Sequence, residues 1–208
     1  NLFLKGNKKV LVEKPLIFNK YYEKKFNNYF NYHNSNLVVS YPYLFSDTLK
    51  YAKILINKNL IGRLKHIKIN INQCGRFVKY DVNKLLAPHA ISILSIFTDV
   101  REIKFQIFNL IKKTNKNETV LILCSKKNRN FATINLSLNY ASFKTQKNIE
   151  IFTDNGTIHC NLSKNEENLK LYAYKKIKKN NYYIGETKLK ITKNFDEQNN
   201  MRKVIETF

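Results

Sequence analysis

Hydrophobic and polar positions follow two different patterns along the chain, and the change comes near Gly62. Before it, Val10 to Val12 and Leu37 to Tyr41 are short apolar runs, typical of strands buried on both faces of a parallel sheet. Between and after them, Asn19 to Asn31 and Asp47 to Ile56 place apolar residues every three or four positions, as amphipathic helices do. This part of the chain is therefore predicted to fold as βαβα.

Beyond Gly62, short strands dominate the pattern. Leu64 to Ile71 alternates as a strand, and Asp81 to Phe97 is mostly helical. Six more strand-like runs follow: Ile103 to Ile111, Thr119 to Ser125, Ala132 to Tyr140, Asn148 to Thr153, Thr157 to Leu162 and Leu169 to Lys175. Together with a hairpin signal at Asn155-Gly156, this series predicts an α+β region with an open, mainly antiparallel sheet. The whole chain is predicted to be of the α/β class.

The charge of the chain is strongly positive, with a net +22 over 208 residues. Five of the 37 basic residues are Arg and the others are Lys, spread along the chain among abundant Asn, Ile and Tyr. These residue types share A/T-rich codons, and Arg is the usual choice for bidentate phosphate recognition. We therefore attribute the charge to composition and expect no specific nucleic-acid partner, with a polyanion-binding module as the third functional hypothesis.

Two further features of the sequence bear on the cellular compartment of the protein. The sequence has no run of about 18 apolar residues and no basic segment leading into an apolar signal core, so we expect a cytoplasmic protein without a membrane partner. Cys74, Cys124 and Cys160 lie far apart without paired spacing. They fit neither a metal site nor a disulfide framework, and we expect ordinary buried thiols.

The tripeptide Glu13-Lys14-Pro15 follows the first predicted strand directly. Ligands of open parallel sheets bind just beyond the carboxyl ends of the strands, and Pro15 restricts Lys14 to extended backbone conformations. If burial lowers its pKa, Lys14 is a candidate proton donor to a carbonyl or alkoxide oxygen. Taken alone, the tripeptide also fits a surface lysine in a lysine-rich chain.

A second candidate, His89, lies in the stretch from Gly75 to Leu94. Pro88 suits the first turn of a helix, which would place His89 near the positive end of the helix dipole, where a neutral imidazole is favoured. A neutral imidazole at pH 7 can accept a proton from a hydroxyl. Taken alone, His89 also fits a packed, hydrogen-bonded histidine.

Together these stretches resemble the Gfo/Idh/MocA family of NAD(P)-dependent oxidoreductases, closest to its sugar and nucleotide-sugar dehydrogenases. The resemblance rests on LKGNKKVLVEKPL, YPYLFSDTLKYAKILINKNLIGRLKHI and DVNKLLAPHAISIL, in the same order and at similar separations. A weaker match is EIFTDNGTIHCNL, from Glu150 to Leu162. The final NNMRKVIETF resembles the start of the family's last long helix, cut short.

The resemblance implies a division of the chain and a set of roles. Residues 1–60 would be the last part of a Rossmann NAD(P)-binding domain, and residues 61–208 a substrate domain whose open sheet also makes a homo-oligomer contact. Glu13, Lys14 and Pro15, with a cis peptide bond before the proline, would lie at the cofactor. Lys14 would contact the reacting sugar and the nicotinamide ribose, and His89 would be the catalytic base. A hydride would pass between a carbon of a sugar or nucleotide sugar and NAD or NADP.

Three departures from the family pattern bear on catalysis. Leu85 stands where many members have an aspartate, four residues before the histidine, and Ala90 stands where nucleotide-sugar members have an acidic residue. Neither side chain can orient an imidazole. The five glycines include no G-x-G-x-x-G turn for a pyrophosphate. The sequence therefore predicts a truncated or degenerate oxidoreductase, with a catalytically inert binding or scaffold subunit as the alternative.

Overall fold

The protein is known from a computed structural model, which describes residues 9–16, 23–24, 37–74, 81–113, 115–127, 129–138, 144–163, 167–179, 182–197 and 199–207. Apart from Glu23 and Lys24, the predicted helix from Asn19 to Asn31 lies outside these ranges, and so does the segment before residue 9. The first two predicted strands are confirmed. β1 (Val10–Glu13) pairs in parallel with β2 (Leu37–Ser40).

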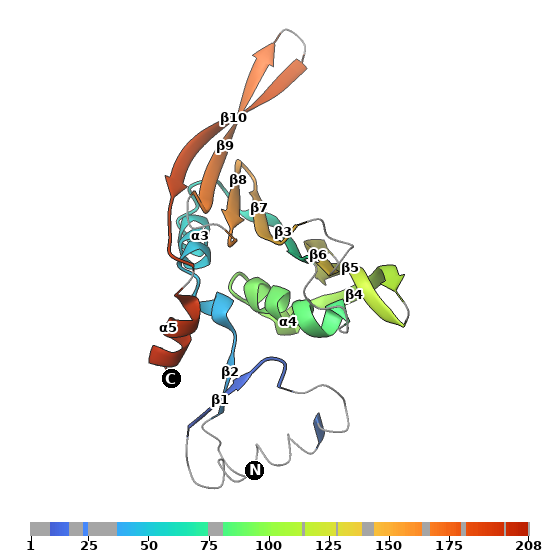
Figure 1. Cartoon of the computed structure of the whole chain (residues 1–208). Coiled ribbons are helices and arrows are strands. Elements are labelled where there is room, and N and C mark those ends of the chain that lie inside the picture. The colour runs from blue at the N-terminus through green and yellow to red at the C-terminus, as the bar shows by residue number, and fades with distance from the viewer. Residues whose placement is uncertain are drawn as a thin grey trace.

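An open sheet of eight strands forms the main body, in the order β10-β9-β8-β7-β3-β6-β5-β4. The strands are β3 (Leu64–Gln73), β4 (Lys104–Lys113), β5 (Lys116–Lys126), β6 (Arg129–Leu138), β7 (Gln146–Thr153), β8 (Gly156–Asn161), β9 (Leu169–Lys179) and β10 (Tyr182–Lys193). β3 pairs in parallel with β6, and the other pairs are antiparallel. The mainly antiparallel sheet is thus confirmed, but β10 was not predicted. The β9–β10 hairpin extends beyond the rest of the sheet (Figure 1).

Among the described residues, five named helical segments accompany the sheet. They are η1 (Pro42–Phe45), α3 (Asp47–Asn57), α4 (Val82–Ser95), η2 (Val100–Glu102) and α5 (Asn200–Thr207). Ser46 caps α3 by accepting a hydrogen bond from the Leu49 amide at 3.2 Å, which satisfies a donor that the helix itself cannot. Figure 1 shows α4 lying between the eight-stranded sheet and the β1–β2 pair.

One face of the sheet is buried and the other is open. Along β3, Ile67, Ile69 and Ile71 are buried, whereas the residues between them are partly exposed, the alternation expected of a strand with one covered face. The same alternation runs through β5, β6, β7 and β8. The buried side chains form one core cluster with residues of α3 and α4, so these two helices pack on the covered face.

A tight turn joins α3 to β3. Asn59 and Gly62 have φ of 53° and 82°, in the left-handed region that glycine adopts most readily. Gly62 also lies against the β7–β8 turn, where an added Cβ would come within 2.7 Å of the Asp154 Cβ. The helix predicted from Asp47 to Ile56 is therefore confirmed, and it ends just before this turn.

The cysteines differ in part from the expectation. Cys124 and Cys160 are buried, but Cys74 is exposed because it follows the last residue of β3. Within the described ranges, no helix has the length and apolar character needed to cross a membrane.

Candidate active site

Lys14 lies just after β1 and reaches across to helix α4. The Lys14–Pro15 peptide bond is cis, as the family resemblance implies. The Lys14 Nζ donates a hydrogen bond of 2.6 Å to the backbone carbonyl oxygen of Leu85. Burial lowers the pKa of Lys14, and the neighbouring charge of Glu13 acts in the opposite direction. Glu13 itself is exposed.

His89 lies one helical turn beyond Leu85 on α4, but its setting differs from the expectation. The helix begins at Val82, after Asp81, whose side chain accepts a hydrogen bond from the Asn83 amide at 2.9 Å. Pro88 is therefore inside the helix and not in its first turn, so placing His89 at the positive end of the dipole was wrong. The pKa of His89 falls to about 3 because the imidazole is buried, and the charges of Lys14 and Lys147 add to the shift.

Two residues that the sequence did not single out complete the surroundings of His89. The Tyr43 ring meets the imidazole edge-on, with ring centroids 5.2 Å apart and planes at 80°. The Lys147 Nζ lies 5.4 Å from the centroid of the Tyr43 ring. A pocket of about 230 Å³ opens here, lined by Pro42, Tyr43, His89, Lys147, Leu162, Glu197, Asn200 and Met201.

The carboxylate of Glu197, at this pocket, is already bonded elsewhere. Its Oε1 accepts hydrogen bonds from the Ser46 hydroxyl and the Thr48 amide, at 2.9 and 3.1 Å, at the start of α3. Its Oε2 accepts one from Asn200 Nδ2 at 2.8 Å. Glu197 therefore joins the C-terminal segment to α3 and is not available to orient His89.

One ring nitrogen of His89 lacks a hydrogen bond in the part of the chain that the structure describes. The Nδ1 atom of His89 is buried and has no hydrogen-bond partner among the described residues. The side chain of Leu85 packs against the core, and Ala90 is fully buried. The imidazole is thus held by packing and by the Tyr43 ring, and no carboxylate of the described residues bonds to its Nδ1 atom.

The structure therefore brings Lys14 and His89 together, although 75 positions separate them in the sequence. Lys14 contacts the same helix one turn away, and its charge acts on the imidazole. A partly desolvated ammonium can donate a hydrogen bond to a substrate oxygen, and a neutral imidazole near it can accept the proton of that oxygen. In the described part of the chain, no three or more His, Cys, Asp or Glu side chains are placed to hold a metal ion.

The fold matches that of solved oxidoreductases. The chain aligns with UDP-N-acetylglucosamine 3-dehydrogenase GnnA from Acidithiobacillus ferrooxidans at a TM-score of 0.70 and 12% identity, covering 99% of this chain and 65% of that one. A 3-ketoreductase from Actinomadura kijaniata, in complex with TDP-benzene and NADP, aligns at 0.71 and 12%, covering 98% and 62%. The WlbA dehydrogenase from Bordetella pertussis, in complex with NADH and UDP-GlcNAcA, aligns at 0.63 and 15%, covering 76% and 50%.

These matches show the fold alone, since identity is low throughout. The chain spans between 50% and 65% of the length of these three proteins. No protein-family model matches the chain, and no curated protein sequence does so either. The fold belongs to the mixed α/β class, with an open, mainly antiparallel sheet that these solved oxidoreductases share. The structural neighbours within this class include NAD(P)-binding enzymes of nucleotide-sugar metabolism.

Proposed function

We propose that the chain is the substrate-side part of an NAD(P)-dependent oxidoreductase acting on a sugar or nucleotide sugar. The observation that carries this proposal is the contact of the Lys14 ammonium with the Leu85 carbonyl, one turn from the neutral imidazole of His89. The fold shared with nucleotide-sugar oxidoreductases supports it.

The roles of the two residues follow from their protonation states. Oxidation of a sugar alcohol to a ketone removes a hydride from carbon and a proton from the hydroxyl oxygen. His89 would take the proton at a ring nitrogen, and Lys14 would donate a hydrogen bond to the oxygen as negative charge develops on it. Bound NAD or NADP supplies the hydride acceptor. In reduction of a ketone, His89 and Lys14 would act in reverse.

The residues present fit only one end of the cofactor. Glu13 ends β1, and Lys14 and Pro15 follow it, where a nicotinamide ribose is expected. The Lys14 ammonium bonds to a backbone carbonyl oxygen, which a ligand oxygen could replace. The sequence has no G-x-G-x-x-G turn that could hold the pyrophosphate. We therefore propose that this chain contributes the nicotinamide end of the cofactor site and the substrate pocket.

A catalytically inert binding subunit is the second candidate. The observation that favours it is that His89 Nδ1 has no partner in the described part of the chain, because a base without a fixed tautomer works poorly. Both candidates predict a sugar-binding pocket, and they differ in whether chemistry follows binding.

We further propose that the open face of the sheet contacts a second copy of the chain. The described helices α3 and α4 pack on the opposite face. Partly exposed polar side chains of β3, β7 and β8, such as Asn70, Glu150 and His159, are left on the open face. A homo-oligomer would cover them.

Calorimetric titration of UDP-N-acetylglucosamine into the 208-residue chain tests the substrate proposal. We expect saturable binding that weakens at least about tenfold in Lys14→Met, the loss expected for one hydrogen bond to a charged group. Lys68→Met is the matched control, since it removes an equal charge from the open face. Equal affinities of the wild-type chain and Lys14→Met, or no binding at all, would contradict the proposal.

A further inference from the structure

Lys147 stands at a position of β7 where the alternation of the strand predicts an apolar side chain. It is in register with Ile71 of β3, and Ile149 and Ile151 follow it on the same, helix-covered face. These isoleucines are buried, whereas Lys147 is partly buried near the start of its strand. An ammonium at the edge of a core loses hydration, which costs free energy unless a partner replaces the water. Lys147 therefore needs a partner.

The described part of the chain gives Lys147 an aromatic ring but no counter-ion. Its Nζ lies over the Tyr43 ring, 5.4 Å from the centroid. None of the ion pairs between described residues includes Lys147. Glu197, the acidic residue that lines the same pocket, has its carboxylate oxygens bonded to the start of α3 and to its own segment. A positive charge therefore remains at this pocket for a ligand.

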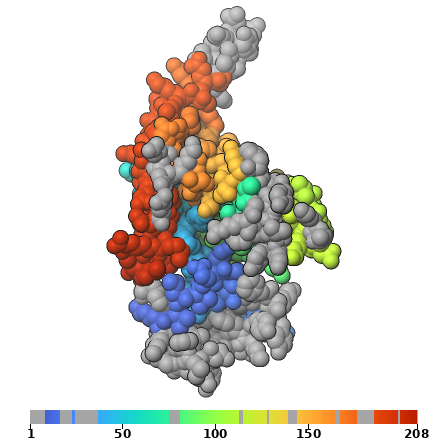
Figure 2. Space-filling view, viewed as in Figure 1, coloured from blue at the N-terminus to red at the C-terminus, as the bar shows by residue number. Residues whose placement is uncertain are grey.

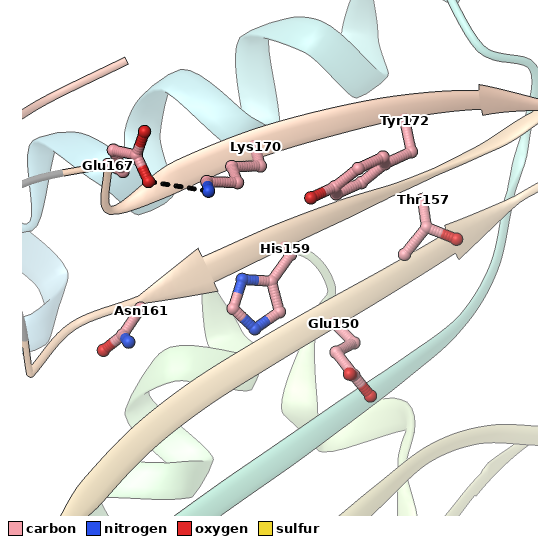
Figure 3. Close-up of a pocket in the computed structure, with 7 residues that line it drawn as sticks. All are labelled: Glu150, Thr157, His159, Asn161, Glu167, Lys170 and Tyr172. Atoms are coloured by element: carbon pink, nitrogen blue, oxygen red, sulfur yellow. Dashed lines mark ion pairs between the residues drawn. The ribbon is translucent and has the colours of Figure 1, made fainter. Parts of the chain in front are cut away.

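Lysines on the open face of the same sheet are arranged differently. Lys170 pairs with Glu167 at 2.7 Å, the dashed line in Figure 3, and Lys68 pairs with Glu150 at 3.4 Å. The pocket of about 360 Å³ in Figure 3, which Lys170 and both glutamates line, thus contains the counter-charges of these lysines. The contrast indicates that the charge of Lys147 is the one that a bound anion would complete.

The pocket at Lys147 lies where the two ends of the described chain meet. Ser40, the last residue of β2, donates a hydrogen bond to Met201 Sδ in α5 at 3.6 Å, and Figure 2 shows the red C-terminal residues next to the blue N-terminal ones. The volume of about 230 Å³ is below the range of about 300–1,000 Å³ that is usual for a drug-sized ligand. The pocket therefore suits one sugar ring and not a whole nucleotide sugar.

We infer that Lys147 binds a negatively charged group carried by the sugar itself, so that the substrate is an acidic sugar such as a uronic acid derivative. The inference rests on the function proposed above and narrows its substrate class. A lysine ammonium is a compact charge with three donors, which suits a carboxylate. The group must belong to the sugar, because the pocket that Lys147 shares with His89 has room for the sugar ring and not for the nucleotide as well.

An anionic sugar also fits the charges that act on His89. After burial, the charges of Lys14 and Lys147 are the causes that lower the pKa of the imidazole. A carboxylate bound at Lys147 offsets one of these two charges, which makes the imidazole a stronger base for the proton of the substrate hydroxyl. A neutral sugar leaves both positive charges without compensation. The acidic sugar is thus the better substrate in binding and in proton transfer.

Calorimetric titration with two ligands that differ in one group tests the inference. UDP-N-acetylglucosamine and its uronate, in which the C6 alcohol is oxidised to a carboxylate, share the same diphosphate. We expect the wild-type chain to bind the uronate at least about tenfold more tightly, the gain expected for a hydrogen bond between charged groups. Lys147→Met should remove this preference by weakening the binding of the uronate alone. Lys147→Arg should retain most of it, because the positive charge and the donors remain.

Lys68→Met is the matched control, since it removes an equal charge from the open face and should retain the preference. Equal weakening of both ligands in Lys147→Met would place this lysine at the shared diphosphate and overturn the inference. A wild-type chain that binds both ligands equally, or does not bind the uronate, would overturn it too. Lys14→Met separates the two proposals. If Lys14→Met binds both ligands as the wild-type chain does while Lys147→Met loses the preference, the proposed oxidoreductase site fails and the anion site stands.

Discussion

Burial lowers the pKa of the His89 imidazole to about 3, and Lys14 and Lys147 act in the same direction. In the unfolded chain the imidazole regains a pKa near 6.5. Between these two values the unfolded state binds a proton that the folded state does not. The stability of the folded chain therefore falls as the pH decreases below 6.5.

We predict that this one residue makes folding sensitive to mild acid. Between pH 7 and pH 5, protonation of unfolded His89 should remove at most about 2 kcal/mol from the free energy of unfolding, at 1.36 kcal/mol per pH unit below 6.5. Urea unfolding of the wild-type chain and of His89→Gln at both pH values measures the difference. The glutamine variant should lose less stability between the two, and an equal loss in both proteins would contradict the assigned pKa.

The residues around His89 show how far the sequence could define the site. Lys14 carried a signal because a proline and a strand end flank it, and the structure does place it at α4. Lys147 carried no such signal, because neither its residue type nor its spacing distinguishes it from the many other lysines of the chain. Tyr43 could not be assigned either, because it meets His89 only after η1 packs near α4. Whether Lys14 and His89 are catalytic stays a prediction.

At the scale of elements, a substitution in the turn between α3 and β3 tests how closely this turn packs against the β7–β8 turn. Gly62→Ala would require a residue with a side chain at φ 82° and would bring its Cβ within 2.7 Å of the Asp154 Cβ. We predict a loss of about 1–3 kcal/mol in the free energy of unfolding. Gly185→Ala on β10 is the matched control, since nothing lies within 4 Å of an added Cβ there.

Denaturant unfolding followed by circular dichroism measures both variants. Gly185→Ala should change stability by less than about 0.5 kcal/mol, as surface substitutions usually do. If Gly62→Ala were equally harmless, the β7–β8 turn would have to lie further from Gly62 than the structure places it.

The strands and helices also show which elements could be predicted from the sequence and which could not. Strands with one buried face, such as β6 and β7, were found because alternation with buried isoleucine or leucine is a strong signal. β10 was missed because, as an edge strand, its described side chains are mostly exposed and rich in lysine. The position of Pro88 was misjudged because a proline is tolerated inside a helix that other contacts stabilise, and Asp81 was the true cap.

For the whole molecule, we predict that the 208-residue chain binds neither NAD nor NADP with micromolar affinity. The glycine-rich turn, the helix dipole behind it and an acidic residue on the ribose supply much of the affinity of a Rossmann domain. The sequence has no such turn, and we propose that the Glu13-Lys14-Pro15 segment contacts only the nicotinamide end. Titration of NADH followed by its fluorescence tests this, with the WlbA dehydrogenase as positive control. Saturable micromolar binding would show that the chain holds a cofactor site that we have not located.

The central place of β3 in the sheet has a consequence for synthesis of the protein. β3 is complete at Gln73, but its two neighbours, β6 and β7, end at Leu138 and Thr153. While a ribosome makes the 65 residues from Cys74 to Leu138, Ile67, Ile69 and Ile71 have no strand to pair with. At about 5–20 residues per second this lasts between about 3 and 13 seconds. During that time the nascent chain displays an apolar strand with two free edges, the kind of segment that aggregates or recruits a chaperone.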